Sequence, residues 1–220
     1  MSTESLLATL PTLQRLALAY APGSAREPTL ALLALDARLA GVVRSAREPM
    51  LAQLRLAWWR EQLRVPVARW PEGEPLLAAL RSWDAERDAL AALADGFEAL
   101  TGAAPLPAAA MEQLARARGQ AFAALARLLG VEREAAAAER LGIDWALADI
   151  AARLGSTKER QTAVALAKAR DWRPAPLSRT LRPLAVLRGL ARRAVLRGET
   201  LDTLPPGALA SVLRVGLLGR

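Results

Sequence analysis

The sequence has 220 residues, of which 53% are hydrophobic and 24% charged, and it carries a formal net charge of +8 with neither cysteine nor histidine. A chain of this length buries enough apolar surface to fold without disulfides. The missing cysteine excludes disulfides and thiolate nucleophiles, and the missing histidine excludes Ser-His-Asp hydrolases, zinc enzymes that rely on histidine and histidine-ligated haem. Any catalysis must use carboxylates, Arg, Lys, Tyr or a hard cation held by oxygen ligands.

The first ten residues, MSTESLLATL, do not have the pattern of an export signal, because they carry Glu4, lack a basic start and lead directly into periodic sequence. Charged residues recur every few positions along the chain, so no run reaches the roughly 18 to 20 apolar residues of a membrane-spanning helix. We therefore expect a cytoplasmic protein whose contact with the inner membrane, if any, is peripheral.

Apolar residues recur at spacings of three and four along nearly the whole chain, whereas alternation at period two is scarce. This pattern predicts an all-α protein with about eight or nine helices separated by Pro and Gly. We find no long linker and no internal repeat, so we predict one domain over residues 1–220. The breaks fall at residues 21–23, 66, 70–75, 102–107, 130, 155, 173–176 and 205–207.

Ser45 and Glu48 stand three residues apart just before Pro49, which is the spacing of a capping box followed by a proline in the first helical turn. The sequence therefore predicts a helix that begins near Pro49. This helix contains the stretch LAWWREQL with its adjacent tryptophans, Trp58 and Trp59.

Two neighbouring apolar stripes run along this helix at spacings of three and four. We expect both stripes to be buried, so that the helix is contacted from two sides. Aromatic residues at such spacing pack into a core more often than they bind a ligand. The first stripe is Leu51, Leu54 and Trp58, and the second is Leu56, Trp59 and Leu63.

Positive charge is concentrated in the last third of the chain, where residues 150–220 contain 14 Lys or Arg against 4 acids. Such a field attracts an anionic membrane surface, a diphosphate or nucleic acid. A solvated, Arg-rich face explains the same composition equally well. Nucleic acid is the least favoured partner, because Trp172 is the only aromatic residue there and no recognition motif is present.

Asp84 and Asp88 form the only pair of aspartates four residues apart. Carboxylates at this spacing share one helix face and could bind a cation. Glu86 and Arg87 lie between them, which favours a solvated helix face with internal ion pairs.

Several stretches of the chain resemble the squalene/phytoene synthase superfamily, the head-to-head isoprenoid synthases. The most specific similarity lies in the first 65 residues, in Tyr20, Arg26 and the segment TLALLALDARLAGVVRSAREPMLAQLRLAWWREQL that begins at Thr29. Weaker similarity continues in Pro105–Pro107, in the helix with Arg116, Gly119 and Leu125, and in residues 141–147 and 181–187.

This resemblance implies an isoprenoid synthase-like helical bundle around a deep apolar cavity. In the active enzymes of the superfamily, two D-x-x-x-D motifs on facing helices hold magnesium ions that grip the substrate diphosphate. The chemistry is sound, because carboxylates four residues apart share a helix face and hard oxygen donors suit Mg²⁺.

The sequence departs from the family's pattern at the acidic motifs. Asp36 matches the first acid of the first motif, but Ala40 stands where the second is needed. Asp149 falls on an Asn position of the family, and Arg153 and Thr157 fall where the second motif has its acids. The chain is therefore more similar to the non-catalytic branch of the superfamily, which includes an assembly factor of respiratory complex I.

We expect a pseudoenzyme without catalytic residues, metal ligands or a cofactor, which binds an apolar isoprenoid or lipid ligand or a partner protein. The alternative is a divergent head-to-head prenyl transferase that uses Mg²⁺ and acts on isoprenoid diphosphates. The candidate pocket residues are Tyr20, Arg26, Asp36, Trp58, Trp59, Arg60 and Asp149.

Asp36 is the strongest of these candidates, because a carboxylate among leucines is costly to bury unpaired. An ion pair with Arg55 or Arg60, across the helix break, is an equally good explanation of Asp36. Tyr20 and Arg26 are expected to precede the Asp36 helix and to line the cavity mouth, and a core or a surface position explains each of them equally well.

Overall fold

The computed structural model describes residues 3–46, 48–173, 175–199 and 201. Within these residues the chain is helical and contains no strand, which confirms the predicted all-α fold. The described part has ten α-helices rather than eight or nine. They are α1 (Thr3–Thr9), α2 (Thr12–Leu18), α3 (Gly23–Ser45), α4 (Pro49–Arg64), α5 (Pro75–Ala79), α6 (Arg87–Glu98), α7 (Ala108–Leu128), α8 (Ala135–Arg153), α9 (Thr157–Lys168) and α10 (Arg182–Arg197).

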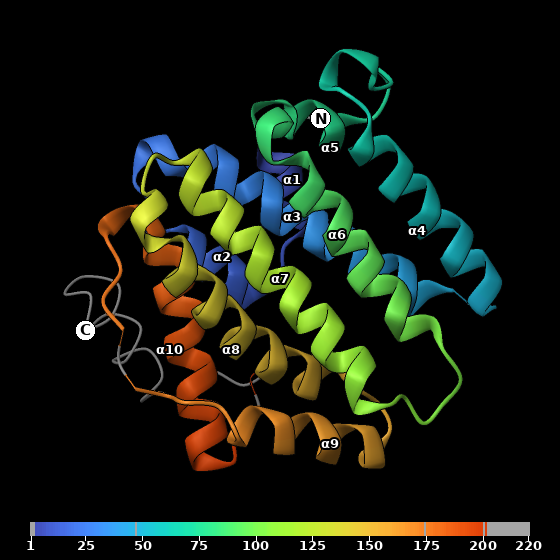
Figure 1. Cartoon of the computed structure of the whole chain (residues 1–220), viewed down its shortest axis with the longest axis vertical. Coiled ribbons are helices and arrows are strands. Elements are labelled where there is room, and N and C mark those ends of the chain that lie inside the picture. Colours follow the sequence, from blue (N-terminus) through green and yellow to red (C-terminus); the bar gives the residue numbers. More distant parts are fainter. Residues whose placement is uncertain (1–2, 47, 174, 200, 202–220) are drawn as a thin grey trace.

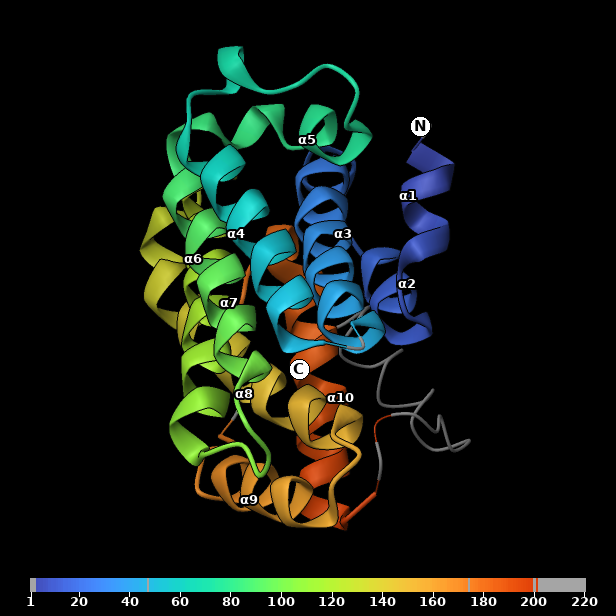
Figure 2. The ribbon, with the colours of Figure 1, turned by 90° about the vertical axis from the view of Figure 1, so that its right-hand side faces the viewer.

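Helix α7 occupies the middle of the bundle, where it packs between α6 and α8 (Figure 1). Helix α3 lies beside them, with α6 and α7 on one side of it and α1 and α2 on the other (Figure 2). Helices α9 and α10 pack on α8, and α10 also contacts α2. The long helices α3, α7 and α8 thereby line the interior from three directions.

The close packing between α7 and α8 depends on two glycines that lie against each other. A Cβ added to Gly142 would come within 3.0 Å of the Gly119 Cα atom. A Cβ on Gly119 would come within 2.7 Å of the Glu139 carbonyl oxygen. Small residues at this crossing let the two backbones approach closely enough for the neighbouring side chains to meet across the bundle.

The expectation that both apolar stripes of α4 are buried is wrong for one of them. Leu56, Trp59 and Leu63 are buried, as predicted. The other stripe, Leu51 and Leu54 with Trp58, remains 46%, 62% and 40% exposed, respectively. The reason is the position of α4 at the edge of the molecule, where α3 and α6 cover its inner face only (Figure 2).

Helix α4 begins at Pro49 as predicted, but without a capping box. Ser45 is the last residue of α3, and Glu48 precedes α4 without a side-chain hydrogen bond to the helix start. The fixed φ of Pro49 in the first turn is the feature that remains to start this helix.

The other predicted breaks separate helices, except that 205–207 lies outside the described residues, as does the end of the predicted domain. In the part of the chain that the structure describes, no helix combines the length and the apolar character needed to cross a bilayer.

Candidate functional site

A buried arginine at the centre of α7 organises the interior of the bundle. The apolar face of this helix is set by Met111, Leu114, Phe122 and Leu125, and Arg118 stands in the same register. Its side chain is only 3% exposed. A cation at such a position must be paired, because an isolated buried charge is prohibitively costly.

Arg118 is paired with two carboxylates that come from facing helices. Its Nε and Nη2 atoms donate to the two carboxylate oxygens of Asp36 on α3, at 2.7 and 2.9 Å. Its Nη1 atom donates to Asp149 on α8 at 3.0 Å. Asp149 also accepts from Arg153 Nε, at 2.8 and 2.9 Å to its two oxygens. We call these four residues the Arg118 cluster; their formal charges sum to zero.

Aromatic rings enclose the guanidinium of Arg118. Its central carbon lies 5.3 Å from the centroid of the Phe97 ring and 5.0 Å from that of Trp145. Both distances suit cation–π attraction, which is stronger in a desolvated site. The rings and the two carboxylates together hold Arg118 in one orientation.

The two carboxyl groups of the cluster differ in protonation behaviour. Burial raises the pKa of Asp36, and the attraction of Arg118 offsets this only in part. Burial also acts to raise the pKa of Asp149, but Arg118 and Arg153 together outweigh it and hold that pKa below its ordinary value. Asp149 is therefore the firmly ionised partner of the pair.

A cavity of about 340 Å³ lies beside the Arg118 cluster. Asp36, Arg118 and Arg153 form part of its wall, and Arg44 adds a further cation. Gln14 on α2 also lines it, and the buried Oε1 atom of this residue has no hydrogen-bond partner among the described residues. The wall of this cavity therefore combines arginine side chains with an amide oxygen that has no hydrogen-bond partner among the described residues.

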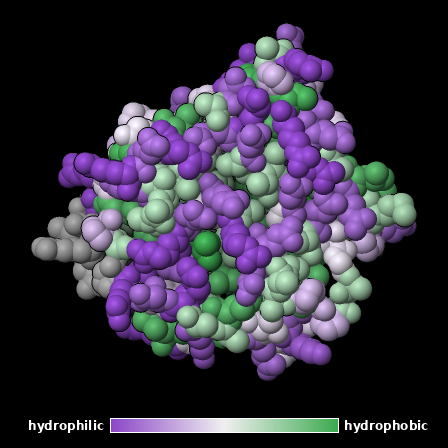
Figure 3. All heavy atoms as spheres, in the orientation of Figure 1, coloured by the Kyte–Doolittle hydropathy of each residue, from purple (hydrophilic) through white to green (hydrophobic). Residues whose placement is uncertain are grey.

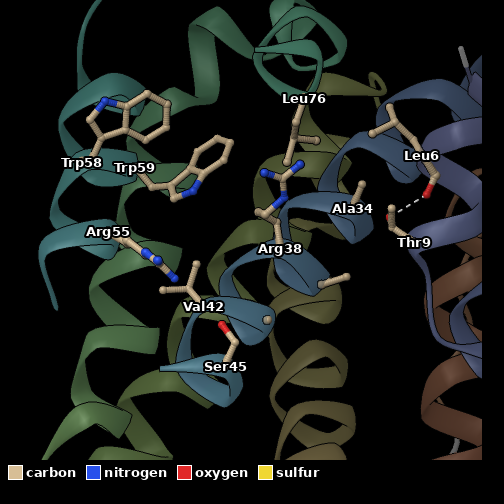
Figure 4. A pocket seen from close by; sticks show the side chains of 12 residues that line it. Leu6, Thr9, Ala34, Arg38, Val42, Ser45, Arg55, Trp58, Trp59 and Leu76 are labelled. Carbon is tan, nitrogen blue, oxygen red and sulfur yellow. Dashed lines mark hydrogen bonds between the residues drawn. The ribbon is translucent and has the colours of Figure 1, made fainter. Parts of the chain in front are cut away.

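A second and larger pocket, of about 540 Å³, lies between α3 and α4, and we call it the α3–α4 pocket. Trp58 and Trp59 form one wall, with ring centroids 5.1 Å apart in an edge-to-face arrangement. Arg38 extends from α3 over the Trp59 ring, at 5.8 Å from its centroid (Figure 4). The pocket therefore combines an apolar interior with cations, because Arg55 lies beside the tryptophans.

The remaining candidate residues take part in helix packing. Arg60 does not reach Asp36 but pairs with Asp95 and Glu98 on α6, at 3.2 and 2.7 Å. Arg26 donates to the carbonyl oxygen of Leu18 at 3.3 Å. Tyr20, in the turn between α2 and α3, is half-buried against the core. None of these three lines either of the two pockets described above.

The expectation that Asp36 pairs with Arg55 or Arg60 is therefore wrong. Asp36 is bound by Arg118 of α7, whereas Arg60 of α4 is bound by Asp95 and Glu98 of α6. Asp36 is an ion-paired residue, as that alternative proposed, but the cation is Arg118. The structure therefore joins Asp36 to Asp149 through one arginine and places Trp58 and Trp59 at a separate pocket.

The family comparison is decisive for this helical bundle. The model of the family described as squalene/phytoene synthase matches residues 15–196, which is most of the chain. The chain belongs to the squalene/phytoene synthase family. No match was found among curated proteins or among solved structures.

The family's acidic motifs imply magnesium, so we asked whether the donors of the Arg118 cluster fit that ion. Mg²⁺ prefers six oxygen ligands in near-octahedral geometry. The cluster offers two carboxylates, and both are already hydrogen bonded to guanidinium groups. The positive charges of Arg118 and Arg153 would repel a metal ion placed beside them. Among the described residues no group of three or more acidic side chains is arranged to hold a metal. The donor set does not fit Mg²⁺.

The acidic run around Asp84 is used for internal pairing. Asp84 accepts from the Val67 backbone N–H and from Arg87, each at 3.1 Å. Glu86 accepts two hydrogen bonds from Arg127, at 2.8 and 2.6 Å. These contacts favour the helix-face interpretation of this run over a cation site.

Sequence reasoning missed a second buried ion pair, centred on Asp144 of α8. The Asp144 side chain is completely buried and pairs with Arg170 at 2.8 Å and with Arg188 at 3.3 Å. Arg188 also donates to the Arg173 carbonyl oxygen at 2.8 Å. A signal was present in the sequence, because Arg118, Asp144 and Arg188 each interrupt the apolar face of a helix.

The contacts of Arg170 and Arg188 bear on the basic last third of the chain. Arg192 likewise donates to the Trp172 carbonyl oxygen at 2.9 Å, and Arg193 pairs with Glu199 at 3.0 Å. Part of the positive charge of this region is therefore used to hold the C-terminal helices together. Contact of residues 150–220 with an anionic surface stays a prediction.

Proposed function

We propose that this member of the squalene/phytoene synthase family is a non-catalytic protein, which binds an apolar ligand or a partner protein in the manner of an assembly factor. The observation that carries this proposal is the position of Arg118. Its guanidinium lies between Asp36 and Asp149, the two acids that remain near the family's motif positions, and it is hydrogen bonded to both.

The electrostatic argument concerns the leaving group of prenyl transfer. An allylic diphosphate ionises when cations neutralise the departing pyrophosphate, and carboxylates must hold those cations. In this chain Ala40, Arg153 and Thr157 stand where the family's pattern has further acids. Asp36 and Asp149 instead form ion pairs with Arg118 and Arg153, so they are poor ligands for metal ions.

The α3–α4 pocket supports the ligand-binding part of the proposal. At about 540 Å³ it falls within the size range of small-molecule sites, and the two tryptophans give it a large apolar wall. Arg38 and Arg55 would face the polar end of a ligand. An isoprenoid or lipid with one apolar chain and a small polar head suits these walls.

A divergent head-to-head prenyl transferase is the second candidate. The observation that favours it is the cavity beside the Arg118 cluster, where Arg44 and Arg153 could attract a diphosphate directly. In that case these arginines would neutralise part of the diphosphate charge. Any Mg²⁺ would then be coordinated by the substrate's phosphate oxygens and by water.

Turnover separates the two candidates. The purified protein is incubated with farnesyl or geranylgeranyl diphosphate and Mg²⁺, and both pyrophosphate and extractable hydrocarbon are measured. We expect neither product. Release of pyrophosphate together with a C30 or C40 hydrocarbon would establish the transferase and refute the proposal.

Ligand binding is tested separately, without Mg²⁺, by titrating farnesol while recording tryptophan fluorescence. Gly41 lines the α3–α4 pocket, and a Cβ added there meets nothing within 4 Å. Gly41→Leu should therefore fill the pocket and weaken a saturable fluorescence change, whereas Gly41→Ala, the matched control, should preserve it. Equal binding by both variants would place the ligand elsewhere.

A further inference from the structure

The charged side chains in the wall of the α3–α4 pocket are both cations. Among the described residues that line this pocket, Arg38 of α3 and Arg55 of α4 are charged, and none is acidic. Glu48 and Glu61 are exposed acids near the two ends of α4, and neither of them lines the pocket. The pocket therefore differs from the outer surface of α4, where charges of both signs occur.

Neither arginine has a strong partner within the described part of the chain. Arg55 is exposed and forms no hydrogen bond or ion pair with a described residue. The Arg38 guanidinium lies over the Trp59 ring and 3.8 Å from the Glu74 carboxylate, which is too long for a hydrogen bond. Glu74 itself accepts a hydrogen bond from the Leu76 backbone N–H at 3.2 Å. The N–H donors of both arginines therefore remain available to a ligand.

The pocket extends along α3, with a polar and an apolar end. Its wall positions on α3 run from Ala34 to Ser45, which is roughly 16 Å at the helical rise per residue. In Figure 4, Arg55 and Ser45 lie toward one end of the pocket, and Leu6 and Leu76 lie toward the other. This shape suits a single apolar chain with a charged group at one end.

One of the two tryptophans in the pocket wall remains largely uncovered. Trp58 is 40% exposed although it lines the pocket. Helix α4 lies at the edge of the molecule, and apolar spheres gather at the right-hand edge of Figure 3, over the end of α4 that lies there in Figure 1. A ligand chain in the pocket would cover part of the Trp58 ring, and burial of this apolar area would favour binding.

We propose, on the basis of the ligand-binding function proposed above, that the α3–α4 pocket takes a carboxylate attached to one apolar chain. Fatty acids and isoprenoid acids share this chemistry. The chain would lie against Trp58 and Trp59, and the carboxylate would accept hydrogen bonds from Arg38 and Arg55. The planar fork of N–H donors in a guanidinium matches the two oxygens of a carboxylate.

The charge of the pocket favours a carboxylate over a phosphorylated head group. Arg38 and Arg55 supply two positive charges, and Glu74 beside Arg38 supplies one negative charge. A carboxylate, with one negative charge, neutralises the remainder. A phosphate monoester carries about −1.5 to −2 at pH 7, and a diphosphate carries more. Since no acid of the described chain lines the pocket, its wall offers no carboxylate ligand for a metal ion that would balance the excess.

Pairs of ligands that differ only in the head group test the proposal on the full chain. Farnesoate is compared with farnesol, and laurate with dodecanol, by calorimetric titration at neutral pH, without Mg²⁺ and below the concentration at which each ligand aggregates. We expect each acid to bind about tenfold or more tightly than its alcohol, because its hydrogen bonds from arginine are charge-assisted. Tighter binding of farnesoate than of laurate would identify an isoprenoid acid as the ligand, and the reverse would identify a fatty acid.

Single substitutions locate the carboxylate. Arg55→Gln should weaken farnesoate binding about fivefold or more and leave farnesol binding within about twofold, whereas Arg55→Lys should keep part of the preference for the acid. Glu74→Gln should tighten farnesoate binding, because Arg38 then has no competing carboxylate. Arg69→Gln is the matched control. Arg69 is exposed in the turn Val67–Arg69 and lies outside the pocket wall, so both affinities should stay within about twofold.

The outcomes distinguish the carboxylate assignment from the proposed function. Equal affinity of the wild-type protein for farnesoate and farnesol would overturn the assignment and leave the ligand-binding function in place. An undiminished preference for the acid in Arg38→Gln combined with Arg55→Gln would also overturn it, because the carboxylate would then bind elsewhere. Failure of all four ligands to bind would overturn both the assignment and the ligand-binding part of the proposed function.

Discussion

Arg118 donates two parallel hydrogen bonds to Asp36, at 2.7 and 2.9 Å, although 82 residues separate them in the sequence. This bidentate contact joins α7 to α3 in the interior of the bundle. The third bond, to Asp149, extends the connection to α8. One side chain therefore couples three long helices in the interior of the bundle.

Replacing Arg118 by methionine should destabilise the fold strongly. The substitution leaves Asp36 buried without a cation and leaves Asp149 with Arg153 alone. Breaking a buried pair by removing one partner costs about 3–5 kcal/mol. Urea unfolding followed by circular dichroism measures the loss, and a cost below about 1 kcal/mol would contradict the central role of the cluster.

The matched variant removes three of the four charges of the Arg118 cluster at once, those of Asp36, Arg118 and Asp149. Asp36→Leu, Arg118→Met and Asp149→Leu together should recover most of the stability that Arg118→Met loses, because the three most deeply buried charges are gone and Arg153, whose side chain is 31% exposed, can turn toward solvent. The triple variant tests whether the cluster stabilises the fold by itself or only avoids unpaired charge. If the triple variant unfolds as readily as Arg118→Met, the loss of stability comes from the lost hydrogen-bond geometry and not from unpaired buried charge.

Asp149 and Asp36 should respond differently to neutralisation. The pKa of Asp149 is lowered from 3.8, so its ionised form adds stability at neutral pH that is lost as pH falls through the lowered folded pKa. The pKa of Asp36 is raised from 3.8, so its contribution is present below 3.8 and is lost as pH rises through the raised folded pKa. Asp149→Asn should therefore cost more at pH 7 than Asp36→Asn.

The measurement is the free energy of unfolding of both variants from pH 7 down to pH 3. The deficit of Asp149→Asn should shrink as the solution is acidified, whereas that of Asp36→Asn should not shrink in the same range. Parallel curves for the two variants would contradict the assigned pKa directions.

Periodicity alone predicts the helical fold, most helix boundaries and the inward stripe of α4. It cannot predict which of two apolar stripes faces solvent, because Leu54 and Leu56 look alike until the neighbours of α4 are known. Asp36 and Asp149 were found through the resemblance to the family. Their partner Arg118 was missed, since long-range pairing leaves no local pattern beyond a cation on an apolar helix face.

The glycine at the α7–α8 crossing predicts a position-specific effect of adding one methyl group. The methyl group of Gly119→Ala would press on the Glu139 carbonyl oxygen and on Ile143 Cγ1, each at 2.7 Å, so the helices must separate. We expect a loss of about 1–3 kcal/mol. Gly41→Ala, where the methyl group meets nothing within 4 Å, should instead stabilise α3 by about 0.5–1 kcal/mol. Thermal unfolding of the two variants should shift in opposite directions.

The Asp144 ion pair predicts a loss that begins in the C-terminal part of the bundle. Asp144→Asn leaves Arg188, whose side chain is 7% exposed, without its carboxylate, whereas Arg170 can turn toward solvent. We expect a cost of about 3 kcal/mol. Hydrogen exchange should show faster opening of α10 and of residues 170–173, because Arg188 also donates hydrogen bonds to the Asp171 and Arg173 carbonyl oxygens.

Asp171→Asn is the control for this prediction. The exposed Asp171 side chain pairs with Arg173 at 3.7 Å, and its replacement should change stability by less than about 0.5 kcal/mol. Equal exchange in the two variants would show that the α8–α10 contact is maintained by apolar packing alone.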